Sequence, residues 1–277
     1  MNGLSGARVA LLEARMSDEA ANLVRRHGGT PYSVPAVRES SIDASESVAR
    51  LIDGLSQKAL QAVIFLTGVG VKALTDNAEK LGREPELVSG LKSAVTICRG
   101  PKPTTALTRI GVQVSVSVRE PFTTAELLEA VATADLAGKG VAIVHYGERN
   151  EALSEALRGQ AGRLDELCLY EWLPPEDIRP LKDLVIELIS GRVEVIAFTS
   201  QVQARHLFQV AEESGRTSEL IETLNRKVVV VSIGPTCTAA LKSFGVSPHV
   251  EPTHPKMGAM FVAMASYVEQ HRRRAPS

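Results

Sequence analysis

Four short segments carry residue types that can hold an anion. They span residues 67–70, 99–102, 199–201 and 234–236, and each directly follows an apolar run rich in Val and Ile. Glycine lets a ligand approach the backbone closely, and proline suits the first position of a helix. If each segment opens a helix, the free N–H groups and the helix dipole favour a carboxylate or phosphate. The candidate binding residues in these segments are Thr67, Gly68, Gly70, Arg99, Gly100, Lys102, Thr199, Ser200, Gly234 and Thr236.

Each segment also has a plainer interpretation. Thr67 and Thr199 can be ordinary helix N-caps, and the two Gly-Pro pairs can be simple turns. The nucleotide-binding patterns GxxxxGK[ST] and GxGxxG do not occur, and neither does the GxSxG pattern of serine hydrolases. The segments therefore predict anion binding without indicating a nucleotide.

Cysteine and histidine give no sign of a metal site or a disulfide framework. The three cysteines, Cys98, Cys168 and Cys237, are odd in number and lack metal-binding spacing. His249 and His254 lie in a proline-rich segment without a supporting Cys or carboxylate pattern. We expect no metal and no cofactor, and we interpret Cys237 as a small buried residue.

Length and charge narrow the class of protein. A chain of 277 residues, divided by about 150 per domain, predicts two domains. The net charge of −1 disfavours a nucleic-acid-binding protein, which is usually basic, so we interpret 272–274 as a solvated tail. The start lacks a signal-peptide pattern and no stretch approaches the ~20 apolar residues of a membrane span. We therefore expect a cytoplasmic protein with no nucleic-acid or membrane partner.

The chain contains an internal duplication. Residues 100–112 and 234–246 share the pattern G-P-x-x-T-x-A-L-x-x-x-G-V, and Gly100 and Gly234 are 134 positions apart. Residues 62–68 and 194–200 match at an offset of 132, and two weaker matches follow in the same order. Several matches at nearly one offset indicate that the chain repeats itself with a half-length near 132.

Each half alternates apolar Val- and Ile-rich runs with segments of helical Ala and Leu spacing. Buried strands that alternate with amphipathic helices form parallel sheets covered on both faces. The predicted fold is therefore α/β, with two doubly wound parallel-sheet domains. Ligands of such sheets bind beyond the carboxyl ends of the strands, where the four segments lie. Two extended, proline-containing segments, 32–38 and 169–175, interrupt the alternation, and we interpret them as crossings between the domains.

With these motifs in their order, the chain resembles the uroporphyrinogen-III synthases over nearly its whole length. The resemblance rests on residues 195–200, 232–235, 240–241 and 245–246, and on Leu169-Tyr170. Residues 65–71, 98–100 and 145–147 resemble a bacterial branch of the family with glycine-rich turns. The family implies a discontinuous domain of residues 1–34 and 175–277 and a second domain of 39–170. Residues 35–38 and 171–174 would form a two-stranded antiparallel linker.

The resemblance also implies an activity. Uroporphyrinogen-III synthases are hydro-lyases of porphyrin and heme biosynthesis, which cyclise hydroxymethylbilane with inversion of ring D through a spiro intermediate. The substrate is a linear tetrapyrrole with eight carboxylates. We expect Tyr170 to act as the catalytic acid, with Tyr146 as a second choice, and Arg15, Arg149, Tyr146 and Gly147 to join the binding residues. The alternative is a non-catalytic regulatory module that binds a tetrapyrrole or another polyanion. We expect a monomer, with no further domain after Val268.

Overall fold

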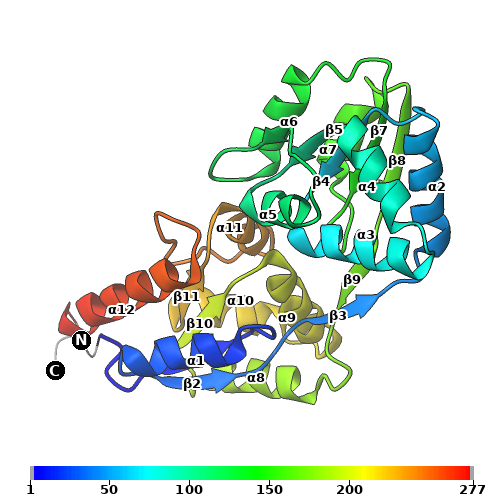
Figure 1. Cartoon of the computed structure of the whole chain (residues 1–277). Helices are drawn as coiled ribbons and strands as arrows, with labels where there is room; N and C mark the ends of the chain where they lie inside the picture. The colour runs from blue at the N-terminus through cyan, green and yellow to red at the C-terminus, as the bar shows by residue number, and fades with distance from the viewer. Residues whose placement is uncertain (1–2, 275–277) are drawn as a thin grey trace. The chain divides into compact units, whose positions relative to one another are not determined.

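The computed structural model describes residues 3–274 and divides the chain into two compact units. Unit 1 combines Met1–Arg38 with Leu173–Ser277, and unit 2 is the continuous segment Glu39–Trp172. Each unit is an open, parallel α/β sheet with helices on both faces (Figure 1). The predicted α/β class with two doubly wound sheets is confirmed.

The sheet of unit 2 has five parallel strands in the order β6-β5-β4-β7-β8. Their bounds are β4 Ala62–Phe65, β5 Val95–Cys98, β6 Val116–Ser117, β7 Gly140–Val144 and β8 Arg163–Leu167. The apolar run of β4 occupies the centre of the sheet, where Ile64 lies opposite Ile97 of β5 and Ile143 of β7. Val63 and Phe65 point to one face and Ala62 and Ile64 to the other, as the two-residue period of a strand requires.

Helices cover both faces of this sheet. Helices α2 Ser45–Ser56, α3 Gly68–Lys80, α4 Glu84–Ser93 and α5 Pro101–Arg109 pack on the face of Val63 and Phe65. Helices α6 Thr124–Thr133 and α7 Glu151–Arg158 pack on the opposite face. The helix after β4 and the helix after β7 therefore lie on opposite faces. This divergence marks the carboxyl ends of the two neighbouring strands as the usual ligand position in such sheets, which we call the crevice of the unit.

Unit 1 repeats this plan. Its parallel strands are β11 Val229–Ser232, β10 Val195–Phe198, β1 Arg8–Leu11 and β2 Thr30–Ser33, in that order across the sheet. Helices α8 Arg179–Ile189, α9 Gln201–Glu213, α10 Thr217–Arg226 and α11 Pro235–Ser243 cover one face. Helices α1 Ser17–Arg26 and α12 Met257–Arg274 cover the other. The order β11-β10-β1-β2 matches β5-β4-β7-β8 of unit 2, so the duplication seen in the sequence recurs in the topology.

Strands β3 Arg38–Ser41 and β9 Tyr170–Leu173 pair in a small antiparallel sheet. We expected the linker strands at 35–38 and 171–174, so the first strand lies three residues later and the second one residue earlier. Pro174 directly follows β9 and lacks the N–H that a ladder needs, and the Ala36 N–H is already bonded to the carbonyl oxygen of Leu12.

Three strands that the sequence pattern did not predict, β8, β6 and β2, lie at the edges of the sheets. Strand β8 reads Arg-Leu-Asp-Glu-Leu, β6 has two residues, and β2 contains Pro31. Edge strands have one open side and need no continuous apolar run, so they carry a weak signal. Among the described residues, no helix is long and apolar enough to cross a membrane.

Candidate functional site

The crevice of unit 2 holds Thr67 after β4 and Tyr146 after β7. Thr67 is the N-cap of α3, and its Oγ1 accepts a hydrogen bond from Gly70 N at 2.9 Å. The same oxygen lies 2.9 Å from the hydroxyl of Tyr170, and either group can be the donor. Thr67 is half-buried, whereas Tyr170 is only 2% exposed. The ordinary N-cap interpretation of Thr67 is therefore correct but incomplete.

Glycine in this turn allows two helix starts to approach each other. A Cβ at Gly68 would lie 2.9 Å from the carbonyl oxygen of Lys102, at the start of α5. A Cβ at Gly70 would lie 3.1 Å from Val144 Cγ1. Gly100 is the N-cap of α5, and the Lys102 side chain is exposed. Both predicted segments of this unit therefore open helices.

Trp172, which the sequence reading did not assign to the site, braces the turn after β7. Gly147 has a φ of +80°, and a Cβ there would lie 2.4 Å from Trp172 Cδ1. The indole N–H of Trp172 donates to the carbonyl oxygen of Tyr146 at 2.9 Å. The Tyr170 and Trp172 rings meet edge to face, with centroids 5.4 Å apart. Gly147 is thus required both by its backbone conformation and by the indole against it.

Arg99 lies beside the crevice, directly after β5. Its guanidinium carbon is 4.8 Å from the centroid of the Tyr146 ring, a cation–π contact. Burial lowers the pKa of Arg99, while Tyr146 and Tyr170 act in the opposite direction. Among residues 3–274 no carboxylate forms an ion pair with Arg99. A partly desolvated cation without an acidic partner is suited to an anionic ligand.

His145 holds the same turn in place through its two ring nitrogens. No sequence motif indicated this structural role. It is fully buried, its Nδ1 accepts from Asn150 N at 3.1 Å, and its Nε2 lies 3.0 Å from a Glu166 carboxylate oxygen. Nδ1 is therefore unprotonated, and Nε2 donates to Glu166. Burial lowers the pKa of His145 and outweighs the carboxylate beside it. Ser154 also donates to Glu166, at 2.6 Å.

The corresponding crevice of unit 1 is occupied by one of the chain's own carboxylates. The Thr199 hydroxyl donates to Glu13 at 2.5 Å and accepts from the Gln203 side-chain amide at 2.8 Å. The Thr199 backbone N–H donates to Gln203 Oε1. The N-cap of α9 is Ser200, so the alternative of Thr199 as an N-cap is wrong. Glu13 and Gln203 had no recognisable motif in the sequence.

The other predicted residues of unit 1 are either buried in the turn or exposed on the surface. Gly234 is buried as the N-cap of α11, and its N–H and carbonyl both contact the Ser232 hydroxyl. Thr236 is exposed, and Cys237 is 2% exposed, with burial raising its thiol pKa to about 11. His249 Nδ1 accepts from Val230 N, so this histidine caps an edge of the sheet.

Two of the predicted basic residues, Arg15 and Arg149, have exposed side chains. Arg15 is exposed, and its backbone N–H donates to Glu13 at 3.2 Å. Arg149 is also exposed and lies 3.9 Å from Glu166. At the carboxyl ends of its strands, unit 2 therefore brings together Thr67, Arg99, Tyr146, Gly147 and Tyr170. Arg149 belongs to the neighbouring cluster of His145 and Glu166.

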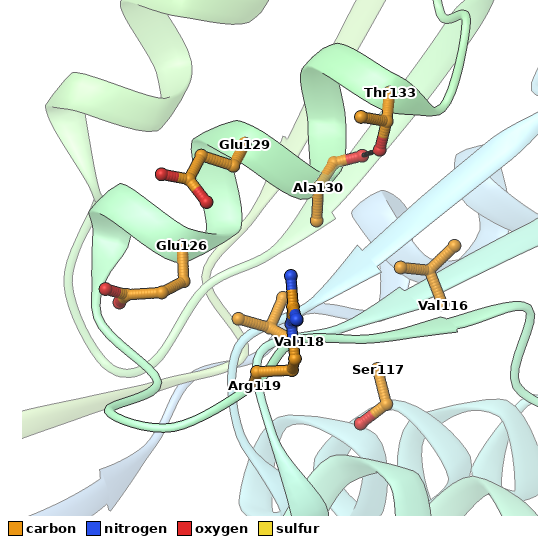
Figure 2. A pocket seen from close by; sticks show the side chains of 8 residues that line it. All are labelled: Val116, Ser117, Val118, Arg119, Glu126, Glu129, Ala130 and Thr133. Atoms are coloured by element: carbon orange, nitrogen blue, oxygen red, sulfur yellow. Dashed lines mark hydrogen bonds between the residues drawn. The ribbon is translucent and has the colours of Figure 1, made fainter.

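A separate hollow of unit 2 contains none of the predicted site residues. It has a volume of about 270 Å³ and lies between β6 and α6. Figure 2 shows the Arg119 side chain pointing toward the helix that carries Glu126 and Glu129. The two carboxylates disfavour an anion there, so the crevice beside β4 remains the better site.

Comparison with known proteins identifies a matching family, two related chains and a similar solved structure. A protein-family model described as "Uroporphyrinogen-III synthase HemD" matches residues 18–262. A Bacillus subtilis protein named YjjA, of uncharacterised function, is 30% identical over 97% of this chain and 98% of its own length. A Methanothermobacter thermautotrophicus protein, provisionally named a uroporphyrinogen-III synthase, is 26% identical over 90% and 93% of the two chains. A mutant Thermus thermophilus uroporphyrinogen III synthase has a similar structure, with a TM-score of 0.77, 24% identity, and coverage of 96% of this chain and 100% of its own.

Proposed function

Because the chain belongs to the uroporphyrinogen-III synthase family, we propose that it cyclises hydroxymethylbilane to uroporphyrinogen III with inversion of ring D. The family consists of cyclising hydro-lyases that act on a tetrapyrrole. Two doubly wound sheets and glycine-rich helix starts agree with this assignment. The proposal extends the family's activity to this chain.

Arg99 is the observation that carries the proposal at the level of residues. The substrate has eight carboxylates, and Arg99 offers a half-buried guanidinium with no carboxylate partner among the described residues. Charge-assisted hydrogen bonds to such a group are about twice as strong as neutral ones. An acetate or propionate arm of the substrate would supply the missing anion beside Tyr146.

The duplicated turn of unit 1 supports carboxylate binding at the turn of unit 2. Thr199 is the counterpart of Thr67 in the repeat, and its hydroxyl donates to the carboxylate of Glu13. Glu13 itself stands at the position equivalent to His145. In unit 2 no acidic residue takes this place, so the Thr67 hydroxyl would donate to a carboxylate or hydroxyl of the substrate instead.

The chemistry requires little from side chains. A pyrrole nitrogen pushes electrons toward the hydroxymethyl carbon, hydroxide leaves with a proton as water, and a cation remains. Ring D then attacks through its substituted carbon, and the spiro intermediate fragments and recloses with ring D reversed. The protein's contribution would be to hold the rings in this geometry and to exclude water from the cation.

Turnover of hydroxymethylbilane with separation of isomers I and III tests the proposal. Without an enzyme the uninverted closure to isomer I competes, so isomer III is the diagnostic product. We expect the wild-type chain to yield mainly isomer III. Tight binding of the substrate with isomer I as the sole product would contradict the proposal and favour a non-catalytic binding module.

A further inference from the structure

We propose that Thr67 donates the proton to the leaving hydroxyl, and that Tyr170 acts behind it as a positioning residue and proton reserve. This inference rests on the proposed function and changes the role that the sequence suggested for Tyr170. It concerns three hydrogen-bonding groups of unit 2, namely Gly70 N, Thr67 Oγ1 and the Tyr170 hydroxyl.

The hydrogen-bonding capacity of Thr67 carries the first step. A hydroxyl has one proton to donate and two lone pairs that accept. Gly70 N donates to Thr67 Oγ1, and the Tyr170 hydroxyl lies 2.9 Å from the same oxygen. A phenol is more acidic than an aliphatic alcohol, so we assign Tyr170 as the donor to Thr67. Both lone pairs of Thr67 are then used, and its proton is directed to a third group.

Burial indicates which hydroxyl a ligand can reach. Tyr170 is 2% exposed, and its ring packs in the hydrophobic core of unit 2 against Trp172. Thr67 is only half-buried, at the carboxyl end of the central strand β4. A general acid must come within hydrogen-bond distance of the group it protonates. Thr67 meets this condition more readily than Tyr170 does.

The duplicated turn provides an independent example of the same pattern. Thr199 Oγ1 accepts a hydrogen bond from Gln203 Nε2 and donates its own proton to Glu13. The threonine of this turn therefore accepts from a protein donor, the Gln203 amide, and donates to an oxygen acceptor, the Glu13 carboxylate. In unit 2 the acceptor would be the leaving oxygen of the substrate.

The proton transfer balances. The C–O bond of the hydroxymethyl group breaks and its electron pair goes to oxygen, while the pyrrole nitrogen supplies electrons to the carbon. Thr67 gives its proton to this oxygen and receives the Tyr170 proton, so water leaves, Thr67 stays a hydroxyl and Tyr170 becomes a phenolate. The proton lost when the pyrrole regains aromaticity returns through Thr67 to Tyr170. Arg99 lies close enough to Tyr170 to interact with the phenolate charge.

Three variants and one control separate the roles of the two residues. Thr67→Val removes the threonine hydroxyl and Thr67→Ser retains a hydroxyl there. Tyr170→Phe removes only the phenolic hydroxyl behind it. Thr123→Val is the matched control, because Thr123 is also an N-cap of unit 2 whose hydroxyl accepts from a backbone N–H. We expect Thr67→Val to lower isomer III formation at least about 100-fold, the usual contribution of a general acid. Thr67→Ser should stay within about threefold of wild type, and Thr123→Val should do the same.

The coupling between the two substitutions distinguishes a relay from two independent structural residues. In a relay, Tyr170→Phe should cost as much as Thr67→Val or less, and adding it to Thr67→Val should cost nothing more. A Tyr170→Phe variant slower than Thr67→Val would overturn the assignment.

A spectroscopic measurement tests the hydroxyl pair without turnover. The chain has four tyrosines, so 13Cζ-labelled tyrosine gives few resonances, and Tyr170→Phe identifies the relevant one. We expect this resonance to shift in Thr67→Val and to stay unchanged in Thr67→Ser and Thr123→Val. An unchanged resonance in Thr67→Val overturns the inference. Isomer III formation by wild type together with a fully active Thr67→Val overturns the inference alone, whereas a wild type that forms only isomer I overturns the proposed function as well.

Discussion

At the residue scale, the two units use equivalent positions differently. The crevice of unit 1 is filled by Glu13, which accepts from Thr199 and from the Arg15 backbone. The crevice of unit 2 has no such carboxylate and instead brings Arg99 and Tyr146 together. A duplicated fold can therefore retain both helix starts while only one of them keeps its donors available to a ligand.

Replacing Arg99 should affect binding more than stability. We expect Arg99→Gln to raise KM about 10- to 100-fold, because hydrogen bonds to charged groups contribute about 1.5–3 kcal/mol. The free energy of unfolding should change little, since Arg99 loses no ion pair with the described residues. Arg83→Gln is the control with the opposite pattern. Arg83 bonds to Asp53 and Glu86, so its loss should lower the urea midpoint and leave KM unchanged. A KM of Arg99→Gln equal to wild type would remove Arg99 from the site.

Two histidines, the buried His145 and the half-buried His249, should make stability depend on pH. Burial lowers the folded-state pKa of His145 and of His249, so the unfolded chain binds more protons once the pH falls below about 6.5. Their contribution is complete above that pH and is lost as the pH falls, at no more than about 1.4 kcal/mol per pH unit for each proton. Urea unfolding between pH 7.5 and 5.5 should show the loss. His145→Gln and His249→Gln should each flatten the slope, and a slope unaffected by either would contradict this account.

At the scale of elements, the start of α3 depends on the start of α5. Gly68 leaves no room for a side chain, because a Cβ would meet the Lys102 carbonyl oxygen at 2.9 Å. Backbone atoms cannot yield as a flexible side chain does. The packing of the two helix starts, and with it the position of the Thr67 hydroxyl, therefore relies on this one glycine.

Gly68→Ala should destabilise the protein by about 1–3 kcal/mol, the usual cost of overpacking. Gly258→Ala on α12 is the control, because nothing lies within 4 Å of its Cβ position. That change should be neutral or stabilising by up to about 1 kcal/mol, since alanine favours helix more than glycine does. Urea midpoints measure both. Equal midpoints for the two variants would show that the helix starts can move apart freely.

At the scale of the whole molecule, the two units differ in chain connectivity, because unit 2 is continuous and unit 1 is discontinuous. All five strands of the unit 2 sheet come from the continuous segment Glu39–Trp172. The unit 1 sheet takes β1 and β2 from the N-terminus and β10 and β11 from the C-terminal half. Because β1 lies between β10 and β2, the C-terminal segment alone lacks a central strand.

A fragment of residues 39–172 should therefore fold by itself, with a cooperative urea transition. A fragment of residues 173–277 should fail to do so, because the edge of β10 that pairs with β1 and the apolar side chains of α12 that pack against α1 would be exposed. Adding a peptide of residues 1–38 to the second fragment should restore helical circular dichroism. Cooperative folding of 173–277 without that peptide would contradict the assigned topology.

The sequence alone determined the class of fold, because strand runs, helical spacing and the 132–134 offset are local or repeated patterns that can be read along the chain. It also located the four helix starts, since small residues and prolines after an apolar run have the same meaning in any fold. It did not reveal the edge strands, whose composition is ordinary, nor the roles of Glu13, Gln203, His145 and Trp172, which belong to no motif.

Only the tertiary structure decided which side chains meet. Thr67 and Tyr170 are 103 positions apart, and Thr199 and Glu13 are 186 apart. Such contacts follow from the order of strands in each sheet, which brings the carboxyl ends of β4, β5 and β7 together at one edge. Strand order results from the packing of the whole unit, and no spacing along the chain encodes it.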